Sequence, residues 1–248
     1  MIKRNKVMGK KMNEKYKNII FDYDGTLVMG STEEFFKVFF REVVAKYVKW
    51  FLSDPAPFKD AFLKSIDAMA NNSSDETNET VFYNSMSNLT GIEVAKLKDF
   101  FVDFYDNEFK YTHEAYDPIP VMSEVLDYLH GRGYNLVLAT DPMFPRNALD
   151  FKLSDCGINP RYFSLITSNQ NCNRTKVSQD FYNMVLNKIN IRPEETLMVG
   201  NHIDKDGNAT LSGIDTILLT DYLVNYDNKK FKNLMSMEEF SKYIKENF

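Results

Sequence analysis

The segment IIFDYDGTL at residues 19–27 places two carboxylates, Asp22 and Asp24, at the tip of an apolar run that has the pattern of a buried strand. An aspartate–glycine step is a strong signal for a tight turn, and a turn would account for the segment by itself. Like charges at the end of a buried strand repel each other, so their placement needs a further reason. The rest of the chain decides between a turn and a site.

Polar residues follow three further apolar runs, which are LVLATD (136–141), ITSNQ (166–170) and MVGNHIDKD (198–206). Lys176 lies between the last two runs and is expected to open a helix. Because ligands of an open parallel sheet bind beyond the carboxyl ends of its strands, these strand ends are expected to meet in one site. A tight turn can explain the polar residues at any one strand end. A shared site also explains why they occur at several strand ends.

The segment after the first strand predicts only helices. Ser31 and Glu34 have the spacing of a capping box, and aromatic residues recur through a helix expected over 31–52. These aromatic residues cover more than one narrow face, which favours burial between other helices. Further helices are predicted over 58–70, 80–88 and 92–110.

From residue 116 onward, short apolar strands alternate with helices. Strands are predicted over 134–140, 162–168, 196–200 and 215–220, and helices over 121–130, 146–156, 177–189 and 208–212. This alternation is typical of a parallel sheet with helices on both faces. The sequence therefore predicts a doubly wound α/β core built from 17–29 and 116–248, an all-helical cap domain at 30–115, and a basic tail at 1–16.

The net charge of −5 and the isoelectric point near 5.4 argue against a surface for nucleic acid or anionic membrane, and favour a small-molecule partner. Cys156 and Cys172 form no CxxC or zinc-binding pattern, so no disulfide framework is expected. This cysteine usage predicts a cytoplasmic location. Residues 1–18 contain no apolar stretch of the kind that a signal peptide or a transmembrane helix needs.

The phosphatases of the haloacid dehalogenase superfamily carry four motifs, and each has a counterpart in this chain. The counterparts are DYDGT at 22–26, a strand that ends in Thr140, Lys176, and VGNHIDKDGNAT at 199–210. The chain resembles this family from Lys17 to about Asp221, and the order of the motifs makes the resemblance specific. It implies a Rossmann-like core, a helical cap inserted after the first motif, and Mg²⁺-dependent hydrolysis of a small phosphorylated metabolite.

The resemblance also implies roles for the motif residues. Asp22 would be the nucleophile that forms an aspartyl-phosphate, and Asp24 would be the acid for the leaving alcohol and then the base for water. Residues two apart on an extended backbone point the same way, which agrees with these roles. Mg²⁺ between the carboxylates would make their repulsion tolerable, with Asp22 and the backbone carbonyl of Asp24 among its ligands. Thr140 would hold phosphoryl oxygens, and Lys176 would neutralise charge.

Two positions depart from the family's pattern. The fourth motif has Asn201 after its glycine, where the family usually has aspartate; an amide oxygen can bind Mg²⁺ but adds no negative charge. Spacing favours Asp206 as the carboxylate ligand, with Asp204 as an alternative that could instead support a ligand or cap a helix. Asp141 follows Thr140 where the family often has asparagine, and it would repel phosphate unless it points away or is protonated.

Substrate contacts are expected from residues near the first two motifs and from the start of the cap, namely Thr26, Asp141, Phe35 and Phe36. In the resembling enzymes, the cap face toward the first motif chooses the substrate, although such aromatic residues are more often core.

Other functions stay open at this point. A phosphomutase of the same family has no distinguishing sequence feature here. A dehalogenase is disfavoured, because that branch lacks the second aspartate that Asp24 supplies. A degenerate protein that binds a phosphate ligand without turnover is suggested by Asn201 and Asp141, while the other motif residues count against it.

Overall fold

The computed structural model describes residue 13 and residues 15–30 and 32–248. Its central sheet has six parallel strands in the order β5-β4-β1-β6-β7-β8. These strands are β1 (Asn18–Phe21), β4 (Asn135–Leu138), β5 (Phe163–Ile166), β6 (Thr196–Gly200), β7 (Asp215–Leu219) and β8 (Leu234–Met235). The predicted doubly wound α/β fold is confirmed, because β1 lies between β4 and β6 and helical connections join the parallel strands from β1 to β7.

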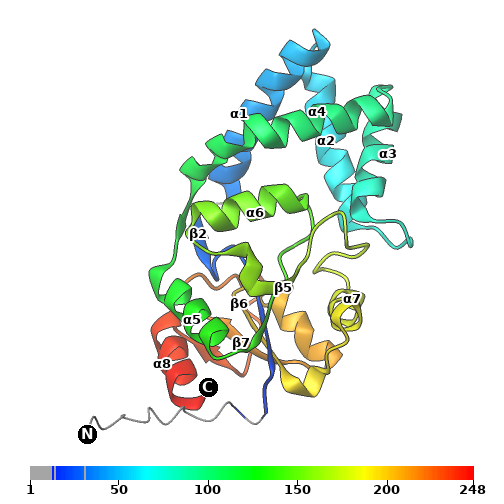
Figure 1. Cartoon of the computed structure of the whole chain (residues 1–248). Helices are drawn as coiled ribbons and strands as arrows, with labels where there is room; N and C mark the ends of the chain where they lie inside the picture. Colours follow the sequence, from blue (N-terminus) through cyan, green and yellow to red (C-terminus); the bar gives the residue numbers. More distant parts are fainter. Residues whose placement is uncertain (1–12, 14, 31) are drawn as a thin grey trace, which may run out of the picture.

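Helices cover both faces of this sheet (Figure 1). They are α5 (Pro120–Gly131), α6 (Arg146–Asp155), α7 (Asp180–Ile189), α8 (Met237–Asn247) and the 3₁₀ helices η2 (Pro160–Tyr162), η3 (Pro193–Glu195) and η4 (Asp206–Ser212). Side chains of a strand alternate between faces, so Ile19 and Phe21 of β1 share a hydrophobic cluster with α5 and α8. Ile20 points to the opposite face and belongs to the cluster of α7. Both faces of β1 are therefore buried.

The register of the sheet brings three strand ends to one level. Phe21 of β1 lies opposite Leu138 of β4 and opposite Val199 of β6. The residues that follow these three strands consequently leave the sheet at the same carboxyl edge. This is the edge that the sequence predicts for the site.

A helical domain lies between β2 (Val28–Gly30) and β3 (Tyr116–Pro118). It contains α1 (Thr32–Phe51), α2 (Pro55–Ala70), α3 (Asn78–Thr90), α4 (Val94–Asn107) and the 3₁₀ helix η1 (Phe109–Ala115). Rings from three helices, such as Phe39, Phe58 and Phe100, are fully buried in its core. Because α1 contacts α2, α4 and η1, it buries aromatic residues on more than one face, as its sequence predicts.

Two antiparallel three-residue strands, β2 and β3, connect the helical domain to the core. Gly30 lies opposite Tyr116, and a Cβ atom at Gly30 would lie 2.6 Å from the carbonyl oxygen of Ala115. Only glycine allows this close approach. The sequence did not predict either strand, because three residues are too few to show a period.

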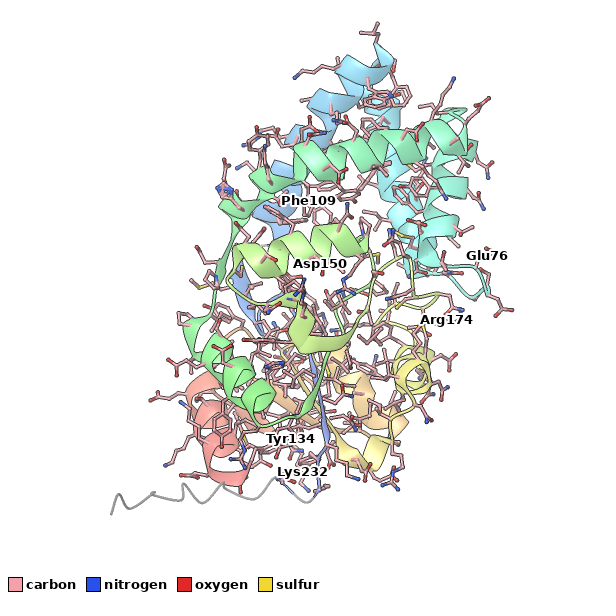
Figure 2. The ribbon with its side chains drawn as sticks, viewed as in Figure 1. Glu76, Phe109, Tyr134, Asp150, Arg174 and Lys232 are labelled. Atoms are coloured by element: carbon pink, nitrogen blue, oxygen red, sulfur yellow. The ribbon has the colours of Figure 1, made fainter. Side chains whose placement is uncertain are left out.

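A second contact joins the helical domain to the loop that precedes α7. The backbone N–H of Asn78 donates to the carbonyl of Cys172 at 2.8 Å, and the guanidinium of Arg174 donates to the carbonyl of Ser74 at 2.7 Å. Figure 2 shows Glu76 of this domain close to Arg174 of the core. The cap is thus held at two places, at the β2–β3 ribbon and at this loop.

Some predicted elements differ from the observed ones. The prediction that Lys176 opens a helix is wrong: it lies in a turn, and α7 begins at Asp180. The helix expected over 92–110 is divided into α4 and η1. Neither β8 nor α8 was predicted, although Ser236 caps α8. The predicted cap at Ser31 lies outside the described residues. None of the described helices is long and apolar enough to cross a membrane.

Candidate active site

The DYDGT motif after β1 is a turn as well as a candidate site. Gly25 has a φ of 77°, and the N–H of Thr26 donates to the carbonyl of Tyr23 at 3.3 Å. The N–H of Asp22 continues the sheet by donating to the carbonyl of Val199 at 2.9 Å. The backbone of Asp22 is therefore fixed by β6 on one side, while the turn carries the chain away from the sheet.

Lys176 lies between two buried carboxylates. Its Nζ atom is 2.5 Å from Oδ1 of Asp22 and 2.7 Å from Oδ1 of Asp206. Burial and then the Asp206 carboxylate raise the pKa of Asp22 to about 7, against the opposing effect of Lys176. Burial alone would lower the pKa of Lys176, but the carboxylates of Asp206 and Asp22 hold it well above its usual value. The lysine is thus a buried cation that faces the candidate nucleophile.

Asp206 is fully buried and holds the loop after β6. Its Oδ2 atom accepts the backbone N–H groups of Asn201 and His202, both at 2.9 Å. A Cβ atom at Gly200 would lie 2.3 Å from this oxygen, so the carboxylate can sit here only because residue 200 is glycine. Both carboxylate oxygens of Asp206 already accept hydrogen bonds, and its role as a metal ligand stays a prediction.

Asn201 packs against the turn that carries Asp22. Its side-chain nitrogen donates to the carbonyl of Tyr222 at 2.7 Å and would lie 2.1 Å from a Cβ atom at Gly25. This bond fixes the orientation of the amide, whose oxygen accepts no hydrogen bond from the residues that the structure describes. Asp204, the alternative carboxylate, forms an ion pair with Lys229 instead.

The two threonines of the predicted site differ in their contacts. The hydroxyl of Thr26 donates to Oδ2 of Asp22 at 3.4 Å. Thr140 is buried after β4, and its carbonyl accepts the hydroxyl of Thr167 at 2.6 Å. The hydroxyl of Thr140 has no hydrogen-bond partner among residues 15–30 and 32–248. It is therefore free to donate to a bound anion.

Asp141 is neutralised by a lysine that sequence reasoning missed. One of its oxygens accepts the backbone N–H of Lys176 at 3.1 Å, and the other lies 2.8 Å from Nζ of Lys205. The repulsion expected between Asp141 and a phosphate is thereby reduced, and Asp141 fixes the turn that carries Lys176. The role of Asp141 in substrate binding stays a prediction.

Asp24 faces a second buried lysine, Lys152 of α6, at 3.3 Å. The side chain of Asp24 is 62% exposed and that of Lys152 only 5%. Both line a cavity of about 70 Å³ together with Phe35 and Phe36, the cap residues predicted to contact substrate. Sequence reasoning missed Lys152, although it follows the buried Ala148 by four residues and so lies on the apolar face of α6.

The donor groups of the site fit a Mg²⁺ ion. Within the described ranges, no three His, Cys, Asp or Glu side chains form a cluster suited to a metal. Mg²⁺ needs fewer protein ligands, because it usually keeps several waters and binds one or two carboxylates with a substrate phosphate. Asp22 offers a carboxylate of this kind, and the amide oxygen of Asn201 is a further oxygen donor. The Asp22 and Asp206 carboxylates also exceed the charge of Lys176, which favours a bound cation.

A family model described as haloacid dehalogenase-like hydrolase matches residues 16–209. No curated protein matches the chain at a significant level. Among solved structures, a HAD phosphatase from Thermococcus onnurineus is 19% identical, with coverage of 92% of this chain and 97% of that chain and a TM-score of 0.57.

Two further solved structures are similar over nearly their whole length. A protein from Thermotoga maritima described as a β-phosphoglucomutase is 18% identical, with coverage of 94% of this chain and 100% of that chain and a TM-score of 0.56. YfnB from Bacillus subtilis, described as a HAD hydrolase bound to magnesium, is 17% identical, with coverage of 93% and 99% and a TM-score of 0.54. At these identities the likeness shows a shared fold.

Proposed function

Because the chain belongs to the haloacid dehalogenase-like hydrolase family, we propose that it is a Mg²⁺-dependent phosphatase that hydrolyses a small phosphorylated metabolite through an aspartyl-phosphate intermediate. The observation that carries the proposal is the buried ammonium of Lys176, 2.5 Å from Oδ1 of Asp22. A carboxylate and a phosphate monoester repel each other, so their reaction needs a fixed cation. Lys176 supplies this cation beside the Asp22 carboxylate, where the phosphate would approach.

The reaction divides between the two carboxylates of the turn. Asp22 attacks phosphorus, the bond from phosphorus to the ester oxygen breaks, and Asp24 gives its proton to the leaving alcohol. Asp24 then takes a proton from a water molecule, which attacks phosphorus and releases the Asp22 carboxylate. Because the Asp24 side chain is partly exposed beside a cavity, it can meet both a leaving group and water.

Fixed donors and cations around Asp22 support the transfer. The Thr140 hydroxyl and Lys176 would hold the phosphoryl oxygens, while Thr26 keeps Asp22 oriented through its hydroxyl. Asp206 positions Lys176 through the 2.7 Å ion pair. These contacts hold Asp22 and Lys176 in place before an ester binds, and such preorganisation favours effective electrostatic stabilisation.

Asp22, the carbonyl of Asp24 and Asn201 would hold Mg²⁺, with Asp206 the further ligand that the sequence predicts. The bound ion would neutralise negative charge on the phosphoryl group and on Asp22. Asn201 contributes an oxygen without a charge, so we expect weaker Mg²⁺ binding than with aspartate at this position.

The proposal is tested by screening phosphate monoesters of small alcohols, with Mg²⁺ and with excess chelator. We expect turnover that requires Mg²⁺ and covalent phosphate on the wild-type chain. Asp22→Asn should abolish both turnover and covalent phosphate. Asp24→Asn should slow turnover by roughly a hundredfold or more, as removal of a general acid does, with the largest loss for poor leaving groups.

A matched control is Asp99→Asn, which makes the same chemical change at an exposed position of α4 and should keep full turnover. Covalent phosphate on the Asp22→Asn chain would refute the assignment of the nucleophile. Binding of phosphate esters without any turnover would instead identify a binding protein that has kept the fold. Equal turnover in excess chelator would refute the metal's role.

A further inference from the structure

Lys152 is a buried cation whose surroundings are mostly aromatic. Its Nζ atom lies 4.6 Å from the centre of the Tyr23 ring, 4.6 Å from that of Phe35 and 5.2 Å from that of Tyr116. Aromatic faces attract a cation but accept no ordinary hydrogen bond. The single hydrogen bond that the Lys152 ammonium donates within the described part of the chain goes to Asp24, at 3.3 Å. Since an ammonium has three N–H groups, part of its donor capacity is unused.

The ammonium lines a cavity that is placed for a leaving group. α6, which carries Lys152, lies between the cap and the sheet (Figure 1). The cavity of about 70 Å³ is bounded by Lys152 and Asp24 on the core side and by Phe35 and Phe36 on the cap side. About 10–15 Å³ of such volume is enough to hold one water molecule, so the cavity has room for a small group of several heavy atoms. Gly30 and Tyr116 also line a larger open groove of about 820 Å³, which adjoins the cavity.

The charges that line this cavity are poorly matched in their burial. Among the described residues, Lys152 has one carboxylate partner, Asp24, whose side chain is 62% exposed and whose Oδ1 atom lies 3.3 Å from the ammonium. A buried cation is costly unless it is well paired and hydrogen-bonded. A carboxylate on the leaving group would supply a second anionic partner inside the cavity and use the free N–H groups. A neutral leaving group would leave Lys152 with the Asp24 contact alone.

We propose that Lys152 selects phosphate esters whose leaving alcohol carries an anionic group close to the ester oxygen, a carboxylate in the smallest case. This inference rests on the proposed phosphatase function and narrows its substrate to phosphorylated small hydroxy acids. The aromatic rings around Lys152 contact the short carbon chain, and its ammonium binds the carboxylate. Lys152 is thereby a specificity residue, in contrast to Lys176, which serves the transferred phosphoryl group.

The alternative role of Lys152 is to position Asp24 alone. Both roles predict that loss of the lysine lowers kcat/KM, but they differ in the esters for which kcat/KM falls. A residue that acts only through Asp24 affects every leaving group that needs a proton. A residue that binds the leaving group's carboxylate affects only esters that carry one. The ratio of two matched substrates therefore separates the two roles.

The test compares the phosphate esters of 3-hydroxypropanoic acid and of its amide, which have nearly the same size and leaving oxygen. We expect wild-type kcat/KM to be at least tenfold higher for the acid ester. In Lys152→Met, an uncharged side chain of similar length, this ratio should fall to about one, and in Lys152→Arg, which keeps the charge, part of it should remain. Lys59→Met is the matched control, because Lys59 lies over the ring of Phe40 at an exposed position.

Each outcome decides the inference. A wild-type enzyme that turns over both esters equally, or a Lys152→Met variant that loses the same factor on both, overturns it. Should Lys152→Met fail to fold, the wild-type ratio still decides, together with inhibition by free 3-hydroxypropanoate against its amide. If neither ester nor any other phosphate ester is turned over with Mg²⁺, the proposed function itself fails. Turnover of the amide ester without preference for the acid leaves that function intact and refutes only the role of Lys152.

Discussion

The buried charges around Asp22 predict that the candidate nucleophile destabilises the metal-free protein at neutral and alkaline pH. Asp22 is 8% exposed, while Lys176 and Asp206 are 1% and 0% exposed. When Asp22 is ionised, two carboxylates share one ammonium in this site, and one negative charge is left uncompensated. Asp22→Asn removes that charge and leaves the Lys176–Asp206 ion pair intact.

The size of the effect follows from the pKa of Asp22. Burial and the Asp206 carboxylate raise this pKa from 3.8 to about 7. A carboxyl group with a raised pKa in the folded state stabilises the fold fully below its unfolded pKa, and this stability is lost as the pH rises through the folded pKa. A shift of about three pKa units corresponds to a loss of about 4 kcal/mol. We therefore expect Asp22→Asn to match the wild type near pH 3.5, below the unfolded pKa of 3.8, and to exceed its free energy of unfolding by an amount that grows with pH to about 4 kcal/mol near pH 8.

The measurement is urea-induced unfolding in excess chelator, across this pH range, for wild type, Asp22→Asn and Asp99→Asn. The last variant alters an exposed carboxylate on α4 and should keep the wild-type pH dependence. Contributions from titrating groups far from Asp22 cancel in the difference between variants. At a concentration of 100 times its Kd, Mg²⁺ should stabilise the wild type by about 2.7 kcal/mol, and it should stabilise Asp22→Asn less.

Two results would refute this reasoning. If Asp22→Asn is the less stable protein near pH 8, the carboxylate of Asp22 contributes more through Lys176 than its burial costs. If the pH dependence of the two chains is the same, Asp22 does not titrate in this range. Either result would contradict the inference that the metal-free site holds one uncompensated negative charge.

The remaining predictions concern the metal site, the neutralised aspartate and the cap. Asn201→Asp should lower the Mg²⁺ concentration for half-maximal turnover, because it adds a charge to the same oxygen position; an unchanged or higher value would show that residue 201 does not bind the ion. Lys205→Met removes the ammonium that pairs with the Asp141 carboxylate, which then repels a phosphate more strongly. The KM for a phosphate ester should therefore rise by about tenfold at most. The free energy of unfolding should fall by less than about 1 kcal/mol. Asn78→Ala removes the buried side-chain amide that donates to the carbonyls of Pro142 and Arg174. The backbone N–H of Glu79, which donates to the carbonyl of Asn169, should then exchange its hydrogen at least about tenfold faster. Unchanged exchange there would show that the backbone bonds alone hold this contact.

The strand ends of the core were accessible to sequence reasoning because the relevant signals are local. A short apolar run followed by polar residues identifies β1, β4 and β6, and the parallel order of such strands places Asp22, Thr140 and Asn201 at one edge. The boundaries of β6 agree with the prediction, since TLMVG is buried throughout. In contrast, β2, β3 and β8 have only two or three residues each. α8 did carry a local signal that could have been used, because Ser236 and Glu239 form a capping box before an apolar face.

The sequence by itself determined the family, the alternation of strands and helices, and the residues that carry the proposed chemistry, since each depends on residue types at short spacing. It did not determine what each charged group faces. Lys152 and Lys205 look like ordinary helix and loop lysines in the sequence, and only the folded chain sets them against Asp24 and Asp141. The physical reason is that electrostatic partners depend on burial and on distances of a few ångströms between segments far apart in the chain, and neither quantity has a local pattern.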